Sequence, residues 1–537
     1  MDSHSMHTHT CGELRREHIG QTVTLTGWVW HRRDHGGLIF VDLRDRDGVT
    51  QVSFDPEHSG GEAFHAAETI RSEWPIKVTG VVRERPEGME NNKIATGEVE
   101  VLIDAIEVLN SSKTPPFQIE DHVDTSEDVR LRYRYLDLRR PRMTANLRMR
   151  SDFTFAIRQA LHDRDFMEVE TPALFKSTPE GARDFLVPSR TQPGHLYALP
   201  QSPQLLKQLL MVGGVERYYQ VAKCFRDEDL RADRQPEFTQ VDIEMSFVEQ
   251  DDVMGALEDV LADAFSKMGV EMPTPLRRLD YWDAMDTYGS DKPDTRFGME
   301  LHDVTQIFSA SKFKLFASAA ATDGQYVKAI NAKGAGAWPR AQIDKLAGVA
   351  AEFGAKGLAW IAFREDGSVN SPIVKFFSDE EMAALREEMG VELGDLVMFA
   401  VADRKTADEI LGGMRLHMAN ALNVPREGHD FLWVVNFPLF HWDDEAKRYE
   451  AEHQPFTLPH VDQLDLLETN PLAMGSCTYD FVMDGFEAGG GGMRIHDVEL
   501  QLKMLEFMGF TEERAKEQFG FLMEALTFGA PPMGGFA

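Results

Sequence analysis

Alternating apolar and polar positions predict a small β domain near the start of the chain. Val23, Leu25 and Val29 alternate with threonines and a tryptophan, the period of two expected of a strand with one buried face. The same period recurs over residues 76–82 and 99–103, and turn signals rich in glycine and proline separate the runs. About five strands within about 100 residues are typical of a small closed barrel, although any small β domain would fit the pattern.

The remainder of the chain has the pattern of mixed helices and strands. A Thr-Pro-Pro break at residues 114–116 is followed by a helix whose apolar stripe includes Phe153 and Ile157. Strands and helices then alternate irregularly, and residues 300–425 form a further mixed block that is rich in alanine and glycine. At about 100–200 residues per domain, 537 residues are expected to hold three or four domains. We therefore predict an α+β multidomain protein.

Composition favours a globular protein of a reducing compartment. The chain is 42% hydrophobic and 27% charged, and charges break its apolar runs before the ~18 residues that a membrane span needs. The His-rich start has no apolar core and is not a secretory signal, and the three cysteines form no zinc or disulfide pattern. We expect no membrane partner and a cytoplasmic location.

The charge is strongly negative overall but locally positive. A net charge of -33 argues against a general nucleic-acid binder, because such proteins are usually basic. The stretch from Arg130 to Arg150, however, holds eight arginines and a single acid, Asp137. This stretch is expected to contact phosphates if the protein binds nucleic acid. The acidic surface fits adaptation to high salt as well as an ordinary acidic protein.

Two strand-like runs around a polar loop bring together charges of both signs. Because residues two apart share one face of a strand, Arg226 and Glu228 are expected to point the same way. The returning run carries Gln240, Asp242 and Glu244 at the same spacing. An arginine beside several carboxylates can hold a phosphate, an amine and a metal together, since its planar group donates two parallel hydrogen bonds. A salt-bridged surface hairpin is the alternative.

A second hairpin is predicted around Asp484-Gly485, a dipeptide typical of two-residue turns. Such a turn pairs Val482 with Glu487, and it also pairs Phe481 with Ala488. The side chains on one face of this hairpin are therefore predicted from the turn alone.

The predicted hairpin places Asp480 diagonal to Glu487 on one face. Two carboxylates so placed repel each other unless a cation lies between them, and Mg²⁺ prefers one or two carboxylates together with phosphate oxygens. Four glycines, 489–492, follow in a strand-like context that usually indicates a bulge or the close approach of a ligand, and Arg494 comes soon after. A flexible turn with surface charges is the alternative.

Five short motifs occur along the chain in one order. They are Glu170-Thr171-Pro172, the loop Pro179-Glu180-Gly181-Ala182-Arg183-Asp184, the loop Gln201-Ser202-Pro203-Gln204, Phe225-Arg226-Asp227-Glu228 with Arg234-Gln235-Pro236-Glu237-Phe238, and Gly489-Gly490-Gly491 before Arg494-Ile495-His496. With these motifs the chain resembles the bacterial-type aspartyl-tRNA synthetases of class II over nearly its whole length. One motif would be weak support, but five in the family's order are specific.

The resemblance implies an architecture, a reaction and partners. It implies L-aspartate attached to tRNA-Asp through an aspartyl-adenylate made from ATP, with Mg²⁺, in a homodimer formed through motif 1. The implied domains are an OB-fold anticodon-binding domain at 1–112, a hinge at 113–140, a class II catalytic domain at 141–298 and 426–537, and a bacterial-type insertion at 299–425.

Site residues are carried over position by position. Arg226 resembles the motif 2 arginine that holds the α-phosphate and the activated carboxyl, and it is the predicted catalytic residue. The implied aspartate contacts are Glu180, Gln204, Lys207, Arg226, Asp242, His453 and Arg494. The implied ATP contacts are Arg226, Asp227, Glu228, Gln235 and Glu487, and the implied Mg²⁺ ligands are Asp480 and Glu487. The implied anticodon contacts or determinants are Arg33, His35, Phe40, Gln51 and Gly88.

The implied selection between amino acids is electrostatic. Lys207 and Arg494 are expected to require an anion, because the neutral amide of asparagine would leave both cations unpaired. Asparaginyl- and lysyl-tRNA synthetases share the architecture and remain alternatives, but lysine specificity would place an acid where Arg494 stands.

Three features depart from the family's pattern. Asp165 stands where a glycine is usual, and Gln454 replaces the second of two adjacent histidines, of which His453 keeps the first. Motif 3, with an arginine that meets ATP, is expected where the sequence ends. The sequence is then either a piece of a longer enzyme or a protein that forms adenylate poorly, so a non-catalytic tRNA-binding paralogue stays open.

Two loop positions bear on which tRNAs are charged. His35 and Gly88 resemble the non-discriminating branch of the family, which charges both tRNA-Asp and tRNA-Asn, whereas specific members more often have leucine at position 35. A histidine that can donate or accept and a small glycine would relax discrimination of the third anticodon base. Dual charging would require an amidotransferase that acts on aspartyl-tRNA-Asn. A discriminating enzyme with ordinary loop residues here is the alternative.

Overall fold

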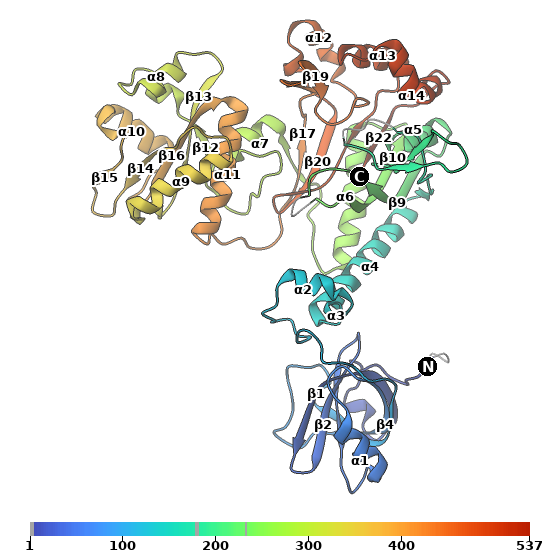
Figure 1. Ribbon diagram of the computed structural model, residues 1–537. Helices are drawn as coiled ribbons and strands as arrows, with labels where there is room; N and C mark the ends of the chain where they lie inside the picture. Colours follow the sequence, from blue (N-terminus) through green and yellow to red (C-terminus); the bar gives the residue numbers. More distant parts are fainter. Residues whose placement is uncertain (1–4, 178–181, 231–233) are drawn as a thin grey trace. The chain divides into compact units, whose positions relative to one another are not determined.

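The computed structural model describes residues 5–177, 182–230 and 234–537, and the chain folds as two units, residues 1–155 and 156–537 (Figure 1). The first unit contains the predicted barrel, closed in the order β1-β2-β3-β5-β4. Val23, Leu25 and Val29 are fully buried in it, which confirms the alternating pattern. Its elements are β1 (Thr22–His35), β2 (Leu38–Arg44), β3 (Val49–Phe54), α1 (Gly60–Thr69), β4 (Pro75–Glu84) and β5 (Val99–Val108).

The segment predicted as a hinge contains helices, and three of its arginines pair with carboxylates of the same unit. The helices are α2 (Glu127–Arg132), α3 (Arg134–Asp137) and the start of α4 (Pro141–His162). Asp137 is buried and accepts hydrogen bonds from Arg134 at 2.6 Å and from Arg140 at 2.8 Å. Arg139 pairs with the buried carboxylate of Glu73 at 2.9 Å. Part of the arginine-rich stretch therefore stabilises this unit rather than standing free for phosphates.

The second unit is built around an eight-stranded sheet in the order β11-β17-β20-β21-β22-β10-β9-β6. The pairing is antiparallel except at its two ends, where β11 runs parallel to β17 and β6 runs parallel to β9. The strands are β6 (Met167–Glu168), β9 (Arg217–Phe225), β10 (Glu237–Ser246), β11 (Arg277–Asp280), β17 (Phe431–Val435), β20 (Thr478–Met483), β21 (Phe486–Met493) and β22 (Met533–Phe536). Segments from both halves of the unit therefore meet at its centre.

Helices and two small hairpins surround this sheet. In α4 the buried residues are Ile157, Ala160 and Leu161, three members of the predicted apolar stripe. The other helices are α5 (Gln204–Val212), α6 (Gln250–Lys267), α7 (Tyr281–Tyr288), α12 (Leu466–Thr469), α13 (Val498–Phe507) and α14 (Glu512–Leu526). The hairpins are β7 (Leu186–Pro188) with β8 (Leu196–Ala198), and β18 (Phe440–Asp443) with β19 (Arg448–Ala451).

Residues 301–421 form a second sheet with its own helices. Five strands pair in the order β12-β13-β16-β14-β15. α11 begins where Asp403 accepts a hydrogen bond from the backbone N–H of Thr406, a typical N-cap. The elements are β12 (Leu301–Asp303), α8 (Lys314–Ala320), β13 (Gln325–Ala332), α9 (Arg340–Glu352), β14 (Ala359–Phe363), β15 (Val369–Asn370), α10 (Asp379–Glu388), β16 (Leu396–Asp403) and α11 (Arg404–Ala421). No helix among the described residues is long and apolar enough to cross a membrane.

Candidate active site

A cavity of about 250 Å³ opens over the central strands of the eight-stranded sheet. Residues distant in sequence line it, because α5, the end of β9, β10, β20 and β21 are neighbours in the fold. Eight of the residues that line it were predicted as site residues, namely Gln204, Lys207, Arg226, Asp242, His453, Asp480, Glu487 and Arg494. The cavity therefore combines cationic and anionic side chains in one place.

Three of the lining residues belong to a buried cluster of four charges, which Glu244 completes. Lys207 Nζ lies 2.9 Å from an oxygen of Asp242 and 3.2 Å from one of Glu244. Arg494 donates to both oxygens of Glu244, with Nε at 3.1 Å and its terminal nitrogen at 3.3 Å. All four side chains are at most 3% exposed. Two cations and two anions balance one another, which is how proteins tolerate buried charge.

Glu244 was not among the predicted site residues. The sequence did contain a signal, because Glu244 shares its strand face with Asp242. A nearby glycine shows how tightly Glu244 is packed, since a Cβ on Gly535 would lie 1.9 Å from its carboxylate. The strand β22 therefore needs a glycine where it passes this side chain.

The sequence suggested that Lys207 and Arg494 require an anionic substrate as their partner. In the structure neither cation is unpaired. Each already has a carboxylate partner. Burial raises the pKa of Asp242, an effect that the nearby Lys207 ammonium opposes. Burial would lower the pKa of Arg494, but Glu244 raises it, so this arginine stays charged. The second oxygen of Asp242, away from Lys207, has no hydrogen-bond partner among the described residues, so it can accept from a ligand.

A pair of carboxylates on the hairpin of β20 and β21 also lines the cavity. Val482 pairs with Glu487 as predicted, but the predicted pairing of Phe481 with Ala488 is wrong. The register shifts at this point, so Phe481 pairs with Gly489, and one extra residue is accommodated as a bulge. The sequence could not show this bulge, because the turn dipeptide alone implies a regular ladder.

Asp480 and Glu487 nevertheless converge over one glycine. A Cβ on Gly490 would lie 2.4 Å from an oxygen of Asp480 and 3.8 Å from one of Glu487. Burial and the neighbouring Asp480 raise the pKa of Glu487, as expected for two carboxylates that lie close together. One buried oxygen of Asp480 has no hydrogen-bond partner among the described residues. Two carboxylates with a free oxygen fit Mg²⁺, which takes its remaining ligands from phosphates and water.

His453 lies beside this pair. Its Nε2 is 3.6 Å from an oxygen of Asp480, and its ring packs edge-on against Phe437 at 4.7 Å between centroids. Burial would lower the pKa of His453, but the contact with Asp480 raises it. Gln454, which departs from the family's pattern, also lines the cavity.

Arg226 is the first residue of the loop that joins β9 to β10. Its backbone N–H donates to the Pro236 carbonyl at 2.9 Å, its guanidinium lies 5.1 Å from the Phe238 ring centroid, and its buried Nε has no partner among the described residues. The expected shared strand face of Arg226 and Glu228 is not found, since β9 ends at Phe225. The period of two does not extend into the loop.

Three of the predicted ATP contacts, Asp227, Glu228 and Gln235, are not among the described residues that line the cavity. Asp227, Glu228 and Gln235 are exposed in the same loop, and Arg234 lies 3.4 Å from the Glu228 carboxylate. Glu180, predicted to contact aspartate, lies outside the described residues.

Four of the five predicted anticodon residues lie on strands β1 to β3 of the barrel. Arg33 donates to Asp42 at 2.7 and 2.8 Å and to the Gln51 side chain at 3.3 Å. His35 and Phe40 have ring centroids 5.9 Å apart in an edge-to-face arrangement.

Gly88 is the fifth of these residues and lies in the β4–β5 loop. Its φ of 81° lies in the left-handed region, so backbone geometry is by itself a reason for glycine there.

Comparison with known proteins defines the class. Residues 126–537 match the tRNA synthetases of class II (D, K and N), and residues 23–109 match the OB-fold nucleic acid binding domain. Together with the cavity, these matches define a class II aminoacyl-tRNA synthetase that carries an OB-fold domain.

Relatives of high identity narrow this class. The chain is 54% identical over 532 residues to the aspartate–tRNA(Asp/Asn) ligase of Desulfatibacillum aliphaticivorans, covering 99% of this chain and 89% of that protein. It is 53% identical over 534 residues to the aspartate–tRNA ligase of Bacillus licheniformis, covering 99% and 90%. The chain belongs to the aspartate–tRNA ligase family of class II synthetases, which confirms the family predicted from the motifs.

Solved structures agree on the fold. Asparaginyl-tRNA synthetase from Pyrococcus horikoshii, complexed with asparaginyl-adenylate, matches with a TM-score of 0.60 at 17% identity, covering 99% of this chain and 93% of that one. Aspartyl tRNA synthetase from Entamoeba histolytica matches with a TM-score of 0.59 at 19% identity, covering 98% and 85%. At such low identity these likenesses support the architecture alone.

Proposed function

We propose that this cavity joins L-aspartate to ATP and then to tRNA. The observation that carries the proposal is the charge cluster of Lys207, Asp242, Glu244 and Arg494 beside Arg226 and a carboxylate pair. An oxygen of the aspartate α-carboxylate attacks the α-phosphorus of ATP, and the bond to the β-phosphate breaks to release pyrophosphate. A ribose hydroxyl at the tRNA 3′ end then attacks the activated carbonyl, and AMP leaves.

The charge cluster is proposed to bind both the ammonium group and the side-chain carboxylate of aspartate. The ammonium group of the substrate pairs with Asp242, whose second oxygen has no hydrogen-bond partner among the described residues. Lys207 and Arg494 donate to the side-chain carboxylate, while Glu244 holds Arg494 in place. The neutral amide of asparagine would present an NH₂ donor to these cationic donors, and that mismatch penalises it.

Arg226 is proposed to be the catalytic residue. No protein nucleophile is needed, so catalysis comes from positioning and from stabilising charge at the α-phosphate. The unpartnered Nε of Arg226 is available to an anion at the cavity. Asp480 and Glu487 would hold a Mg²⁺ ion, which neutralises phosphate charge when it is bound. Glu180, Gln204, His453, Asp227, Glu228 and Gln235 are proposed as further substrate contacts.

Amino-acid identity provides the test of this function. The full-length protein should support ATP–pyrophosphate exchange with aspartate, and neither asparagine nor lysine should replace it at equal concentration. Exchange driven equally well by asparagine would contradict the assignment of the charge cluster.

Phe40 is predicted to contribute to tRNA binding through base stacking. Replacing Phe40 with alanine should weaken tRNA binding by about 5- to 150-fold, because stacking on an aromatic ring is worth ~1–3 kcal/mol per base. Adenylate formation should not change. Leu38→Ala, on the same strand, is a control that removes apolar surface without removing an aromatic ring. Filter-binding and pyrophosphate-exchange assays separate the two effects, and slower exchange in Phe40→Ala would remove this residue from the anticodon.

Dual tRNA specificity is predicted to depend on His35. The full-length protein should charge both tRNA-Asp and tRNA-Asn, because an exposed histidine can hydrogen-bond to either third anticodon base. His35→Leu should selectively lose tRNA-Asn charging. Aminoacylation of the two purified tRNAs measures this, and an unmutated enzyme that leaves tRNA-Asn uncharged would end the hypothesis.

The remaining parts of the proposal concern assembly and context. We propose a homodimer formed through motif 1, a cytoplasmic location, and the division into domains at residues 1–112, 113–140, 141–298, 299–425 and 426–537. Dual charging further proposes an amidotransferase that converts aspartyl-tRNA-Asn to asparaginyl-tRNA-Asn. The names of several relatives, which include both Asp and Asn, support this part.

A further inference from the structure

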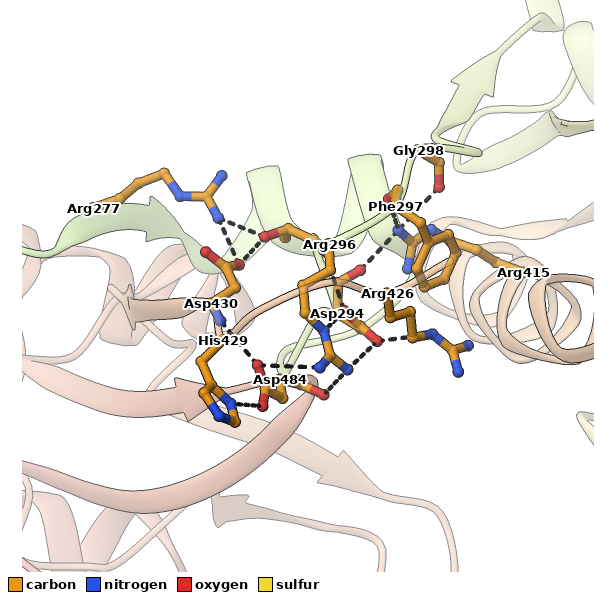
Figure 2. A network of polar contacts seen from close by, with 11 residues as sticks. Arg277, Asp294, Arg296, Phe297, Gly298, Arg415, Arg426, His429, Asp430 and Asp484 are labelled. Atoms are coloured by element: carbon orange, nitrogen blue, oxygen red, sulfur yellow. Dashed lines mark hydrogen bonds and ion pairs between the residues drawn. The ribbon is translucent and has the colours of Figure 1, made fainter. Parts of the chain in front are cut away.

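The hairpin that carries Asp480 and Glu487 is held at its tip by residues outside the hairpin (Figure 2). The Asp484 carboxylate accepts hydrogen bonds from the His429 ring at 2.7 Å and from the backbone N–H of Asp430 at 2.8 Å. The Asp484 N–H donates back to the Asp430 carbonyl at 3.0 Å. With a φ of 56°, Asp484 occupies the left-handed region, which such local hydrogen bonds stabilise.

The segment Asp294–Gly298 packs against the outside of this turn, and we call it the turn-contacting segment. Arg296 donates to the Asp484 carbonyl oxygen at 3.3 Å and lies 3.4 Å from its carboxylate. Asp294 orients Arg296 through two hydrogen bonds of 2.9 Å. The contact with the turn is direct, because a Cβ on Gly485 would lie 2.8 Å from the Cβ of Asp294.

Arg415 anchors the turn-contacting segment to α11. One terminal nitrogen of its guanidinium donates to the carbonyl oxygens of Asp294, Phe297 and Gly298, at 2.9, 2.8 and 3.1 Å. The guanidinium also lies 4.0 Å from the Phe297 ring centroid, and the residue is 1% exposed. Figure 2 shows Arg415 on one side of the segment and the Asp484 turn on the other. A buried cation with three backbone acceptors fixes the path of the segment.

The backbone of the hairpin is only weakly constrained by its own residues. Its second strand contains four glycines at 489–492, and the bulge beside Phe481 interrupts the ladder. The carboxylate pair therefore lies on a part of the sheet that needs support from its surroundings. Lys292, just before the turn-contacting segment, also approaches Glu487 to within 3.8 Å.

We propose that the turn-contacting segment is a clamp through which α11 sets the position of Asp480 and Glu487, and that Arg296 and Arg415 are positioning residues for the divalent cation. This rests on the proposed role of the two carboxylates as cation ligands. Neither arginine is among the residues that line the cavity over the described chain. Residues 301–421, which form the second sheet and its helices, thus contribute to the reaction without supplying a residue to the cavity lining.

The test measures cation affinity, hairpin opening and substrate affinity in the full-length protein. The variants are Arg296→Gln, which removes the contact with the turn, and Arg415→Lys, which keeps the charge but loses the forked donor. Arg364→Gln is the matched control, because Arg364 also donates to backbone carbonyls, those of Gly336 and Trp338. The readouts are Mn²⁺ binding in the presence of a non-hydrolysable ATP analogue, hydrogen–deuterium exchange of residues 478–493, and separate KM values for ATP and aspartate.

Arg296→Gln and Arg415→Lys should weaken Mn²⁺ binding by about 2- to 30-fold, the range typical of coupling through packed contacts. They should speed exchange in the hairpin and raise the KM for ATP, while the KM for aspartate stays within about twofold and kcat falls less than kcat/KM for ATP. Arg364→Gln should change none of these. Thermal unfolding identifies a variant that fails to fold. If Arg415→Lys fails to fold, Arg296→Gln alone provides the test.

Two results would overturn the clamp, and they are distinguishable from a failure of the cation site. If folded variants bind Mn²⁺ as before and the hairpin's hydrogen–deuterium exchange is unchanged, the turn-contacting segment does not position Asp480 and Glu487. Weakened affinity for ATP and aspartate alike would indicate general damage instead of positioning. Glu487→Gln tests the cation site separately, and unaltered Mn²⁺ binding in that variant would remove the cation role and the clamp's function together.

Discussion

Replacing Arg226 with glutamine is expected to slow aspartate-dependent ATP–pyrophosphate exchange by about 100- to 1,000-fold, the effect typical of removing one charge-stabilising donor. The reason is that the proposed first step uses no protein nucleophile, so Arg226, which we propose binds the α-phosphate, should provide much of the charge stabilisation. Arg226 lines the cavity, its Nε has no hydrogen-bond partner among the described residues, and its guanidinium packs on the Phe238 ring. Glutamine keeps a polar end group, but its side chain is shorter and carries no charge.

The matched control for this variant is Arg217→Gln at the other end of the same strand. Arg217 donates to the Arg164 carbonyl and packs on Phe166, outside the cavity. The Arg217→Gln protein should catalyse ATP–pyrophosphate exchange at the rate of the unmutated protein. An Arg226→Gln enzyme with near-normal exchange would mean that charge at the α-phosphate is stabilised by other groups.

Replacing Arg494 with glutamine is expected to have two separable effects. Aspartate activation should fall by about 10- to 150-fold, because a charged hydrogen bond to the substrate carboxylate is worth ~1.5–3 kcal/mol. Stability should fall as well, since the buried Glu244 loses its arginine and keeps only Lys207 at 3.2 Å. Breaking a buried ion pair on one side typically costs ~3–5 kcal/mol, and the remaining lysine should keep the loss near the lower end.

The double variant Arg494→Gln with Glu244→Gln separates these effects. It removes both charges of the pair, so stability in urea unfolding should recover most of the loss. Aspartate activation should not recover, because the donor to the substrate is still missing. If activation recovered together with stability, Arg494 would have a structural role and the aspartate carboxylate would bind elsewhere.

The sequence by itself determined the local elements and the family. Period-two alternation predicted the barrel strands, because a strand with one buried face must place Val23, Leu25 and Val29 on the same side. Motifs in order predicted a class II synthetase, and the comparisons confirm it. The sequence and its resemblance to the family predicted Lys207, Asp242, Asp480 and Arg494 as site residues, and the structure places all four around one cavity, while their roles stay predictions.

Only the tertiary structure decided how these charges are satisfied. The pairing of Arg494 with Glu244 joins residues 250 positions apart, and no local pattern contains such a distance. The bulge beside Phe481 follows from the fit of β21 between its neighbours β20 and β22, so the turn dipeptide could not predict it. The three carbonyl contacts of Arg415 likewise depend on the path of the backbone, because carbonyl acceptors are the same for every residue type. Burial makes each of these contacts necessary, and burial is a property of the folded chain.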